Sequence, residues 1–290
     1  MQEAAENKNG QTKDMMSTHS RYSVGLTYVY PVISRRAGGV SIGINLNTNN
    51  ACNWQCVYCQ VPNLTRGKPE KVDLALLEKE LTGFLDEVLH GHFMEEFVPE
   101  NARQLCDIAF SGNGEPTSTA EFPEVVRLMA TLKTRYPEIA ELPVRLITNG
   151  SFMGKESVQE AVKMLSTIGG EVWFKVDAIS KVLQQKTNGV SQTIDAMLNR
   201  LTACAKCCPT WLQTCLFSWD KQAPDETQIA DYLQFCRQAK EAGIQGIHLY
   251  TIARKPMLPE GIHLSALTAQ MMDDIAQRIR ALDIVVKVSV

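Results

Sequence analysis

The sequence has little of what several protein classes require. Aromatic residues make up only 7% of the 290 residues, and the 29 basic and 32 acidic residues leave a net charge of −3. This balance gives no overall attraction to nucleic acid or to an anionic membrane. No window approaches the roughly 20 apolar residues of a membrane span. The 44% apolar content excludes a disordered chain or a collagen-like fibre, and the length suffices for a full hydrophobic core.

The N-terminus also has no apolar segment of the length that a secretory signal requires. Residues 1–22 are rich in Gln, Asn, Lys and Glu, which predicts a disordered leader. No composition break or internal repeat follows, so residues 23–290 are predicted to form one domain. We therefore expect a cytoplasmic protein whose thiols are kept reduced.

The cysteines of this sequence are unusually arranged. There are nine, an odd number in a chain too long to need disulfides for stability, and three lie between positions 52 and 59. This grouping indicates metal chemistry in a reducing compartment.

From about Val40 onward, short β-branched runs alternate with longer segments of helical period, separated by Gly, Pro, Asn or Asp. Such alternation predicts a parallel sheet in an α/β fold. The predicted strands are 41–46, 106–110, 144–148, 171–176, 210–216 and 246–250, with a short terminal strand at 284–288. The predicted helices are 73–89, 121–135, 156–168, 192–205, 224–242 and 267–282, the first with Asp73 as its N-cap. Periodicity alone leaves two architectures open, a partial barrel and a doubly wound sheet.

Unusual residues follow the predicted strands one after another. In either architecture, functional groups gather where parallel strands end. We therefore expect a shared mouth built from Cys52, Cys56 and Cys59, the 111–116 turn, Asn149, Asp177 and Arg254.

The first of these loops reads Cys-x3-Cys-x2-Cys, with Tyr58 just before Cys59. Three thiolates on one short loop can bind three corners of a cubane iron–sulfur cluster, because soft sulfur ligands suit such clusters. The fourth iron would then be open to substrate. The alternatives are a structural zinc site with a fourth ligand from elsewhere, and three buried apolar cysteines.

This loop resembles the signature of the radical S-adenosylmethionine (SAM) enzymes. The segment Ser111-Gly-Asn-Gly-Glu-Pro-Thr117 is similar to the family's Gly-Gly-Glu-Pro stretch, although Asn113 stands where the first glycine usually does. The Thr148-Asn-Gly turn resembles a turn common in these barrels. Two further stretches, at 175–178 and 249–256, resemble the subgroup of wyosine-base synthases, which rebuild a guanosine of transfer RNA. The resemblance covers residues 40–256.

The resemblance implies a partial (β/α)6 TIM-like barrel of the radical SAM type, with a [4Fe-4S] cluster on Cys52, Cys56 and Cys59. It implies that S-adenosyl-L-methionine chelates the open iron. One electron, from a flavodoxin- or ferredoxin-type donor, then cleaves SAM to methionine and a 5′-deoxyadenosyl radical, which abstracts hydrogen from substrate. The implied SAM contacts are Tyr58, Gly114, Glu115, Pro116 and Asn149.

Lys175 and Asp177 lie on one side of a predicted strand, and with Arg254 they are the candidates for catalysis or substrate contact. A purely structural ion pair is the alternative for Lys175 and Asp177. The substrate stays open between transfer RNA, a small molecule and a protein, and the rival class is a non-catalytic zinc or iron–sulfur module. A second cluster is a further alternative, with four candidate thiols at Cys204, Cys207, Cys208 and Cys215; we expect Cys215 to lie at the mouth.

Overall fold

The structure is a computed structural model that describes residues 25–34 and 38–290. The predicted leader at 1–22 therefore lies outside the described residues. Within them, no helix is long and apolar enough to cross a membrane.

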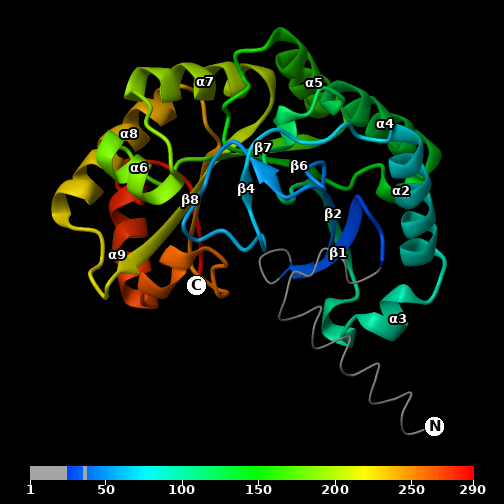
Figure 1. The fold of residues 1–290 in the computed structure, drawn as a ribbon, viewed down its shortest axis with the longest axis horizontal. Coiled ribbons are helices and arrows are strands. Elements are labelled where there is room, and N and C mark those ends of the chain that lie inside the picture. Colours follow the sequence, from blue (N-terminus) through cyan, green and yellow to red (C-terminus); the bar gives the residue numbers. More distant parts are fainter. Residues whose placement is uncertain (1–24, 35–37) are drawn as a thin grey trace, which may run out of the picture.

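A curled sheet forms the centre of the molecule (Figure 1). Its strand order is β1-β2-β5-β6-β7-β8-β9-β11. All neighbours from β2 to β11 pair in parallel, whereas β1 is antiparallel to β2. The strands are β1 (Val29–Ser34), β2 (Gly39–Ile44), β5 (Leu105–Phe110), β6 (Val144–Thr148), β7 (Gly170–Lys175), β8 (Thr210–Trp219), β9 (Gly246–Thr251) and β11 (Val286–Ser289).

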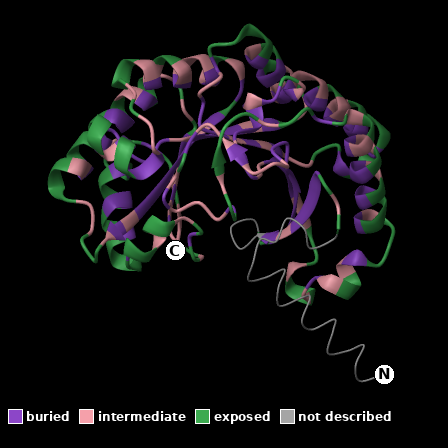
Figure 2. Ribbon diagram, in the orientation of Figure 1, coloured by how far each residue is buried: buried purple, intermediate pink, exposed green. Residues whose placement is uncertain are grey.

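Helices cover the convex side of this sheet, and their inward faces are buried while their outward faces are exposed (Figure 2). Asp73 caps the first of them, because its carboxylate accepts a hydrogen bond of 3.0 Å from the Leu76 amide. The long helices are α2 (Leu74–Leu89), α4 (Phe122–Arg135), α5 (Glu156–Thr167), α7 (Ile194–Cys207), α8 (Glu226–Glu241) and α9 (Ala269–Arg280). The short ones are α3 (Phe93–Phe97) and α6 (Lys181–Asn188), with 3₁₀ turns at Glu100–Ala102, Pro116–Ser118, Pro137–Ile139 and Pro259–His263.

This arrangement decides between the two architectures that periodicity left open. The long helices lie outside the curve of the sheet (Figure 1), which is a partial barrel and not a doubly wound sheet. Among the described strands, the sheet path ends at β1 and β11 without joining them, so the barrel is open. The partial-barrel prediction is confirmed.

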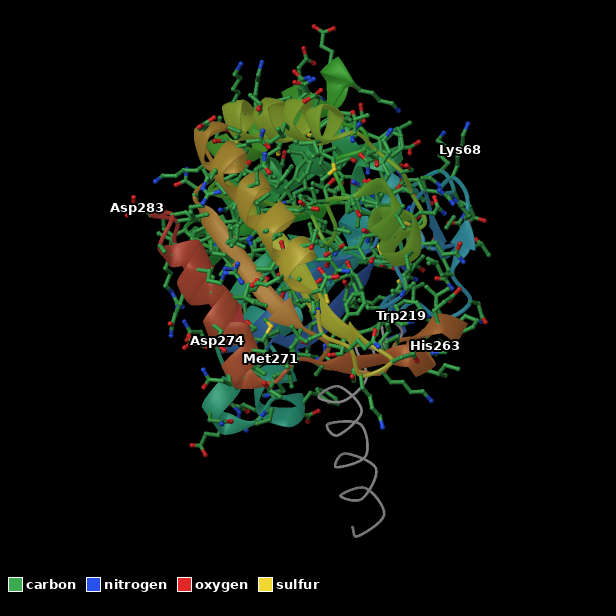
Figure 3. The ribbon with its side chains drawn as sticks, turned by 90° about the vertical axis from the view of Figure 1, so that its left-hand side faces the viewer. Lys68, Trp219, His263, Met271, Asp274 and Asp283 are labelled. Atoms are coloured by element: carbon green, nitrogen blue, oxygen red, sulfur yellow. The ribbon has the colours of Figure 1, made fainter. Side chains whose placement is uncertain are left out.

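The predicted strands are present within two residues at each end, except that β8 runs on to Trp219 where the prediction ended at Leu216. The extension is explained by β10 (Leu264–Ala266), which pairs with it antiparallel. The Trp219 ring also stacks on His263 with 5.6 Å between centroids (Figure 3). The end of β8 is therefore supported by the chain that follows β9. A second small ladder, between β3 (Ala51–Cys52) and β4 (Thr65–Arg66), lies in the cysteine loop.

The turn after β6 requires glycine at position 150. Gly150 has φ +70°, and an added Cβ would lie 2.2 Å from the Phe174 ring. We expect Gly150→Ala to lower the free energy of unfolding by about 1–3 kcal/mol. Gly154→Ala, where a Cβ meets nothing within 4 Å, should change it by less than about 0.5 kcal/mol. Urea unfolding of both variants checks this, and equal stabilities would contradict the role of the turn.

Candidate functional site

The concave side of the sheet holds a cavity of about 620 Å³. Side chains and loops at the ends of the parallel strands line much of it, as the strand-end pattern predicts. The predicted site residues that line the cavity are Cys52, Cys56, Cys59, Tyr58, Gly114, Glu115, Asn149, Lys175 and Arg254. The structure places Pro116 in the 3₁₀ turn behind Glu115, and Asp177 on the wall of a smaller neighbouring cavity of about 390 Å³.

The cysteine loop is held to the barrel by backbone hydrogen bonds on several sides. The amides of Gln55 and Val57 each donate, over 2.9 Å, to carbonyls at the end of α6, those of Asn188 and Thr187. The Cys59 carbonyl accepts from the Met257 amide over 2.8 Å. The loop that carries the three thiols is thus fixed by segments from distant parts of the chain.

Two of the loop thiols have specific hydrogen-bond donors. The Cys52 sulfur accepts from the Trp54 amide over 3.4 Å, and the Cys56 sulfur accepts from the Asn188 side-chain amide over 3.2 Å. Burial raises the pKa of Cys52 to about 11 and that of Cys56 to about 12. Without metal, both thiols are therefore protonated at neutral pH.

All nine cysteines are free thiols. Among the described residues, no three or more His, Cys, Asp or Glu side chains are grouped so as to hold a single metal ion. A cubane cluster does not need such convergence, since each thiolate binds a different iron. Three soft thiolate ligands from one loop are suited to a cubane iron–sulfur cluster.

Glu115 follows β5 and lines the same cavity as the cysteine loop. Its carboxylate is buried, and burial raises its pKa, although four donors favour the ionised form. Oε1 accepts from the Thr117 amide and from the hydroxyls of Thr117 and Thr148. Among the described residues, Oε2 accepts only from the Asn149 amide, over 2.7 Å. Glu115 thereby ties the end of β5 to the end of β6, and Oε2 retains capacity for a further donor.

Gly114 brings the β5 turn against the cysteine loop. A Cβ at this position would lie 2.2 Å from the Ala51 carbonyl oxygen, so only glycine permits this approach. On the other side, the Asn149 side-chain amide donates to the Asn53 side chain over 2.9 Å. The two predicted SAM-contact turns therefore both touch the loop that carries the cysteines.

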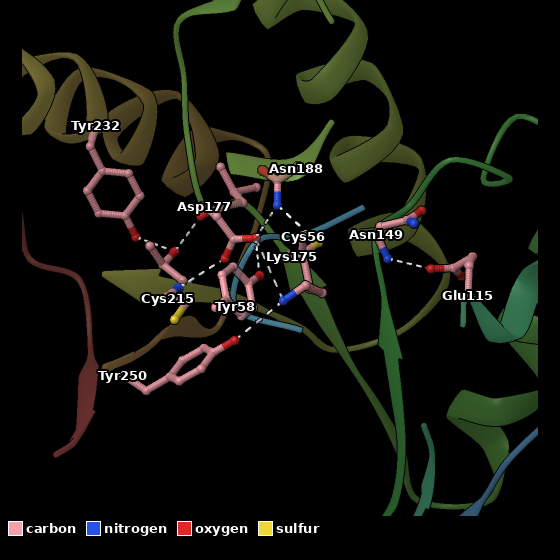
Figure 4. A network of polar contacts seen from close by, with 12 residues as sticks. Cys56, Tyr58, Glu115, Asn149, Lys175, Asp177, Asn188, Cys215, Tyr232 and Tyr250 are labelled. Atoms are coloured by element: carbon pink, nitrogen blue, oxygen red, sulfur yellow. Dashed lines mark hydrogen bonds and ion pairs between the residues drawn. The ribbon is translucent and has the colours of Figure 1, made fainter. Parts of the chain in front are cut away.

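A polar network joins the cysteine loop to β7 (Figure 4). The buried Asp177 carboxylate accepts from the Tyr58 hydroxyl, from the Asn188 amide over 2.9 Å and from the Cys215 backbone amide over 3.0 Å. The Lys175 ammonium lies 3.7 Å from the same carboxylate. Lys175 and Asp177 thus form an ion pair, which the sequence left as the alternative to a catalytic role, and Asp177 connects it to the loop.

The Lys175 ammonium stays charged. Burial, the largest effect, would lower its pKa, but the Asp177 carboxylate together with Tyr250, Cys56 and Cys215 more than reverses this, so the pKa is raised. The ammonium also lies 5.0 Å from the centre of the Tyr58 ring and 3.4 Å from the Tyr250 hydroxyl. It is a half-buried cation with aromatic neighbours at the wall of the cavity.

Of the four thiols weighed for a second cluster, only Cys215 lines the main cavity. Cys204 and Cys208 belong to the hydrophobic core. Their sulfurs contact the Thr210 hydroxyl at 3.5 Å and the Gly170 carbonyl at 3.2 Å. Cys215 thus lies apart from the helix cysteines, as its strand position predicts.

Three contributors to the site were not predicted from sequence: Asn188, Thr148 and Gln213. Asn188 comes 132 positions after Cys56, and no local pattern connects the two. The sequence indicates Thr148 only as part of the turn after the strand predicted at 144–148. Gln213 is the one amide side chain in a strand whose other polar residues are hydroxyls, which was the one available signal.

The chain matches no family model. It is 30% identical over 129 residues to a protein of Brachyspira hyodysenteriae named GTPase Obg, covering 44% of this chain and 16% of that protein. It is 25% identical over 158 residues to a UPF0026 protein of Methanocaldococcus jannaschii, covering 54% and 42%. The matches thus span less than half the length of either relative.

Two of the solved structures that share the architecture illustrate the match. Streptococcus suis SuiB bound to precursor peptide SuiA superposes with a TM-score of 0.57 at 12% identity, covering 87% of this chain and 48% of that one. A radical SAM methyltransferase from Sphaerobacter thermophilus gives a TM-score of 0.57 at 13% identity, covering 87% and 66%. The chain therefore has the partial-barrel fold in which a radical SAM enzyme is built.

Proposed function

We propose that this protein is a radical SAM enzyme that binds a [4Fe-4S] cluster through Cys52, Cys56 and Cys59. The observation that carries the proposal is the convergence of three thiols from one clamped loop on the same cavity as Glu115 and Asn149. The fold agrees with it, but the proposal depends on these side chains, because fold by itself does not imply function.

When bound, the cluster supplies one electron that cleaves SAM to methionine and a 5′-deoxyadenosyl radical. The chain's own residues hold the reactants. Oε2 of Glu115 is placed to accept from the methionine ammonium, since it has a single donor among the described residues. Gly114, Pro116 and Asn149 set the position of that carboxylate. Tyr58 is proposed to line the adenine side with its backbone while its hydroxyl is held by Asp177.

Lys175 and Arg254 are proposed to contact substrate, because both line the cavity. Asp177 is a positioning residue, since it acts through Tyr58, Asn188 and Lys175. A low-potential donor of the flavodoxin or ferredoxin type is the proposed electron source. The wyosine-type reaction on transfer RNA stays a prediction from the sequence resemblance, and a transfer RNA that is neither bound nor altered at moderate salt would contradict it.

The test is anaerobic reconstitution with iron and sulfide, followed by dithionite and SAM. We expect a brown protein, an electron paramagnetic resonance (EPR) signal that changes when SAM is added, and formation of 5′-deoxyadenosine. A colourless protein that holds one zinc ion would favour the non-catalytic module instead. A cluster that forms without any 5′-deoxyadenosine would remove the radical mechanism.

Asn188 is expected to tune the cluster, because its side-chain N–H donates to the Cys56 sulfur and such bonds stabilise the reduced, more negative cluster. Asn188→Ala should lower the reduction potential by roughly 20–60 mV, the one-electron equivalent of one hydrogen bond. Potentiometric titration followed by EPR measures this. Asn101→Ala, at an exposed position, is the control, and an unchanged potential in Asn188→Ala would contradict the contact.

A further inference from the structure

The cavity has a second polar wall, distinct from the one proposed for SAM. Glu115 and Asn149 follow β5 and β6, whereas Lys175, Gln213 and Tyr250 come from β7, β8 and β9. Figure 4 shows Lys175 and Tyr250 together, apart from Asn149 and Glu115. A ligand between the two walls would therefore meet different chemistry on each side.

Gln213 is the unexplained residue on this second wall. It is only 3% exposed and lines the cavity, yet its side-chain oxygen has no hydrogen-bond partner within the described part of the chain. Buried polar atoms are almost always paired. An unpaired amide oxygen at a cavity wall points to a ligand that donates a hydrogen bond.

Lys175 supplies the complementary group beside it. Gln213 and Lys175 are register partners on neighbouring parallel strands, so their side chains project from the same face of the sheet. The ammonium has three donor hydrogens. Within the described part of the chain, its one hydrogen bond is the 3.4 Å contact with Tyr250, because the Asp177 carboxylate, 3.7 Å away, lies beyond hydrogen-bond distance. It therefore has donor capacity left for a ligand oxygen.

We propose that Lys175 and Gln213 form a two-point recognition site for the substrate. The ligand group it fits has an oxygen acceptor next to an N–H or O–H donor. The acceptor binds the Lys175 ammonium and the donor binds the Gln213 oxygen. An amide or lactam edge and a hydroxy acid share this chemistry. The assignment of the ligand as substrate rests on the proposed function, whereas the binding itself does not.

The wall is aromatic around this pair. Tyr58, Trp173 and Tyr250 line the same cavity, and the Lys175 ammonium already faces the Tyr58 ring. Such walls exclude water and strengthen the polar contacts between them. Discrimination against a ligand that lacks the donor is therefore expected to be large, because Gln213 would remain unpaired.

The test uses the full-length, cluster-loaded protein with SAM and without reductant, and measures probe binding by ligand-observed NMR. The probes are 2-pyrrolidone for the lactam edge, glycolate for the hydroxy acid, and N-methyl-2-pyrrolidone, which keeps the carbonyl but has no N–H. We expect either 2-pyrrolidone or glycolate to bind. The one that binds shows whether the site recognises an amide or lactam edge or a hydroxy acid. N-methyl-2-pyrrolidone should bind at least about tenfold more weakly than 2-pyrrolidone if the lactam is preferred.

Substitutions of Gln213 provide a second test of the recognition site. Gln213→Met keeps the side-chain length without the oxygen, and it should weaken binding of the preferred probe at least about tenfold. Gln213→Glu restores an acceptor oxygen, and it should bind the preferred probe more tightly than Gln213→Met does. Gln234→Leu, at an exposed position on α8, is the control and should leave binding unchanged. Circular dichroism shows that each variant is folded, and the comparison of probes on the wild-type protein needs no variant.

The inference is overturned if neither 2-pyrrolidone nor glycolate binds, or if Gln213→Met binds the preferred probe like the wild type. Where 2-pyrrolidone is the preferred probe, equally tight binding of N-methyl-2-pyrrolidone also overturns it. These outcomes are separable from failure of the proposed function, which is scored by 5′-deoxyadenosine formation. SAM cleavage without probe binding would contradict the recognition site and leave the radical mechanism supported. Probe binding without SAM cleavage would contradict the radical mechanism and leave the recognition site supported.

Discussion

Replacing Cys52, Cys56 or Cys59 singly with alanine is expected to abolish reductive SAM cleavage. Each thiolate is proposed to bind a different iron, and all three line the cavity, so no other thiol on the loop can replace the one removed. Loss of an outer-shell partner of a metal typically costs about 10- to 100-fold, and loss of a ligand itself should exceed about a hundredfold. The measurements are iron content after reconstitution and 5′-deoxyadenosine formed per cluster.

Cys207→Ala is the matched control, since Cys207 is a half-buried cysteine near the end of α7. It should load iron and cleave SAM like the wild type. Full activity in any of the three loop variants would remove that residue from the ligand set. Equal loss in Cys207→Ala would show that cysteine replacement destabilises the protein generally.

Asp177→Ala is expected to have the largest effect on stability. The change removes the acceptor for Tyr58, Asn188 and the Cys215 amide and leaves the Lys175 ammonium without its counter-ion. The Asp177 side chain is 0% exposed and that of Lys175 is 17% exposed, so water cannot take over these contacts fully. Breaking a buried ion pair from one side typically costs about 3–5 kcal/mol.

Urea unfolding measures this change in the free energy of unfolding. Asp231→Ala, at an exposed position on α8, should change it by less than about 0.5 kcal/mol. Asp177→Asn keeps an oxygen for the Cys215 amide and should lie between the wild type and Asp177→Ala. A loss below about 1 kcal/mol in Asp177→Ala would mean that the network contributes little to folding.

Strand and helix positions were largely predictable because they depend on local periodicity. The strand at Val144–Thr148 was predicted with both ends correct, and the N-cap at Asp73 is confirmed. The elements that were missed have no such periodicity. The buried residues of α6 are Gln184, Thr187 and Asn188, so it has no apolar stripe. β1 contains Pro31, which is tolerated at the edge of a sheet but obscures the strand pattern.

The candidate site divides in the same way. The three-cysteine loop and the Gly114-Glu115-Pro116 turn are recognisable because their chemistry depends on close spacing. The contact between Asn188 and Cys56 could not be recognised from the sequence, because α6 and the cysteine loop are far apart in the chain. The placement of Asp177 behind Lys175, with Asp177 on the wall of the smaller cavity, also required the structure.

The sequence by itself determined the parallel strands, the helices between them and the loop with three thiols, since each of these depends on residues that are neighbours in the chain. Only the tertiary structure decided which polar groups are paired and which face the cavity. That outcome depends on the register between strands and on packing across the barrel. Lys175 and Gln213 illustrate this, because they are 38 positions apart in the sequence and neighbours in the sheet.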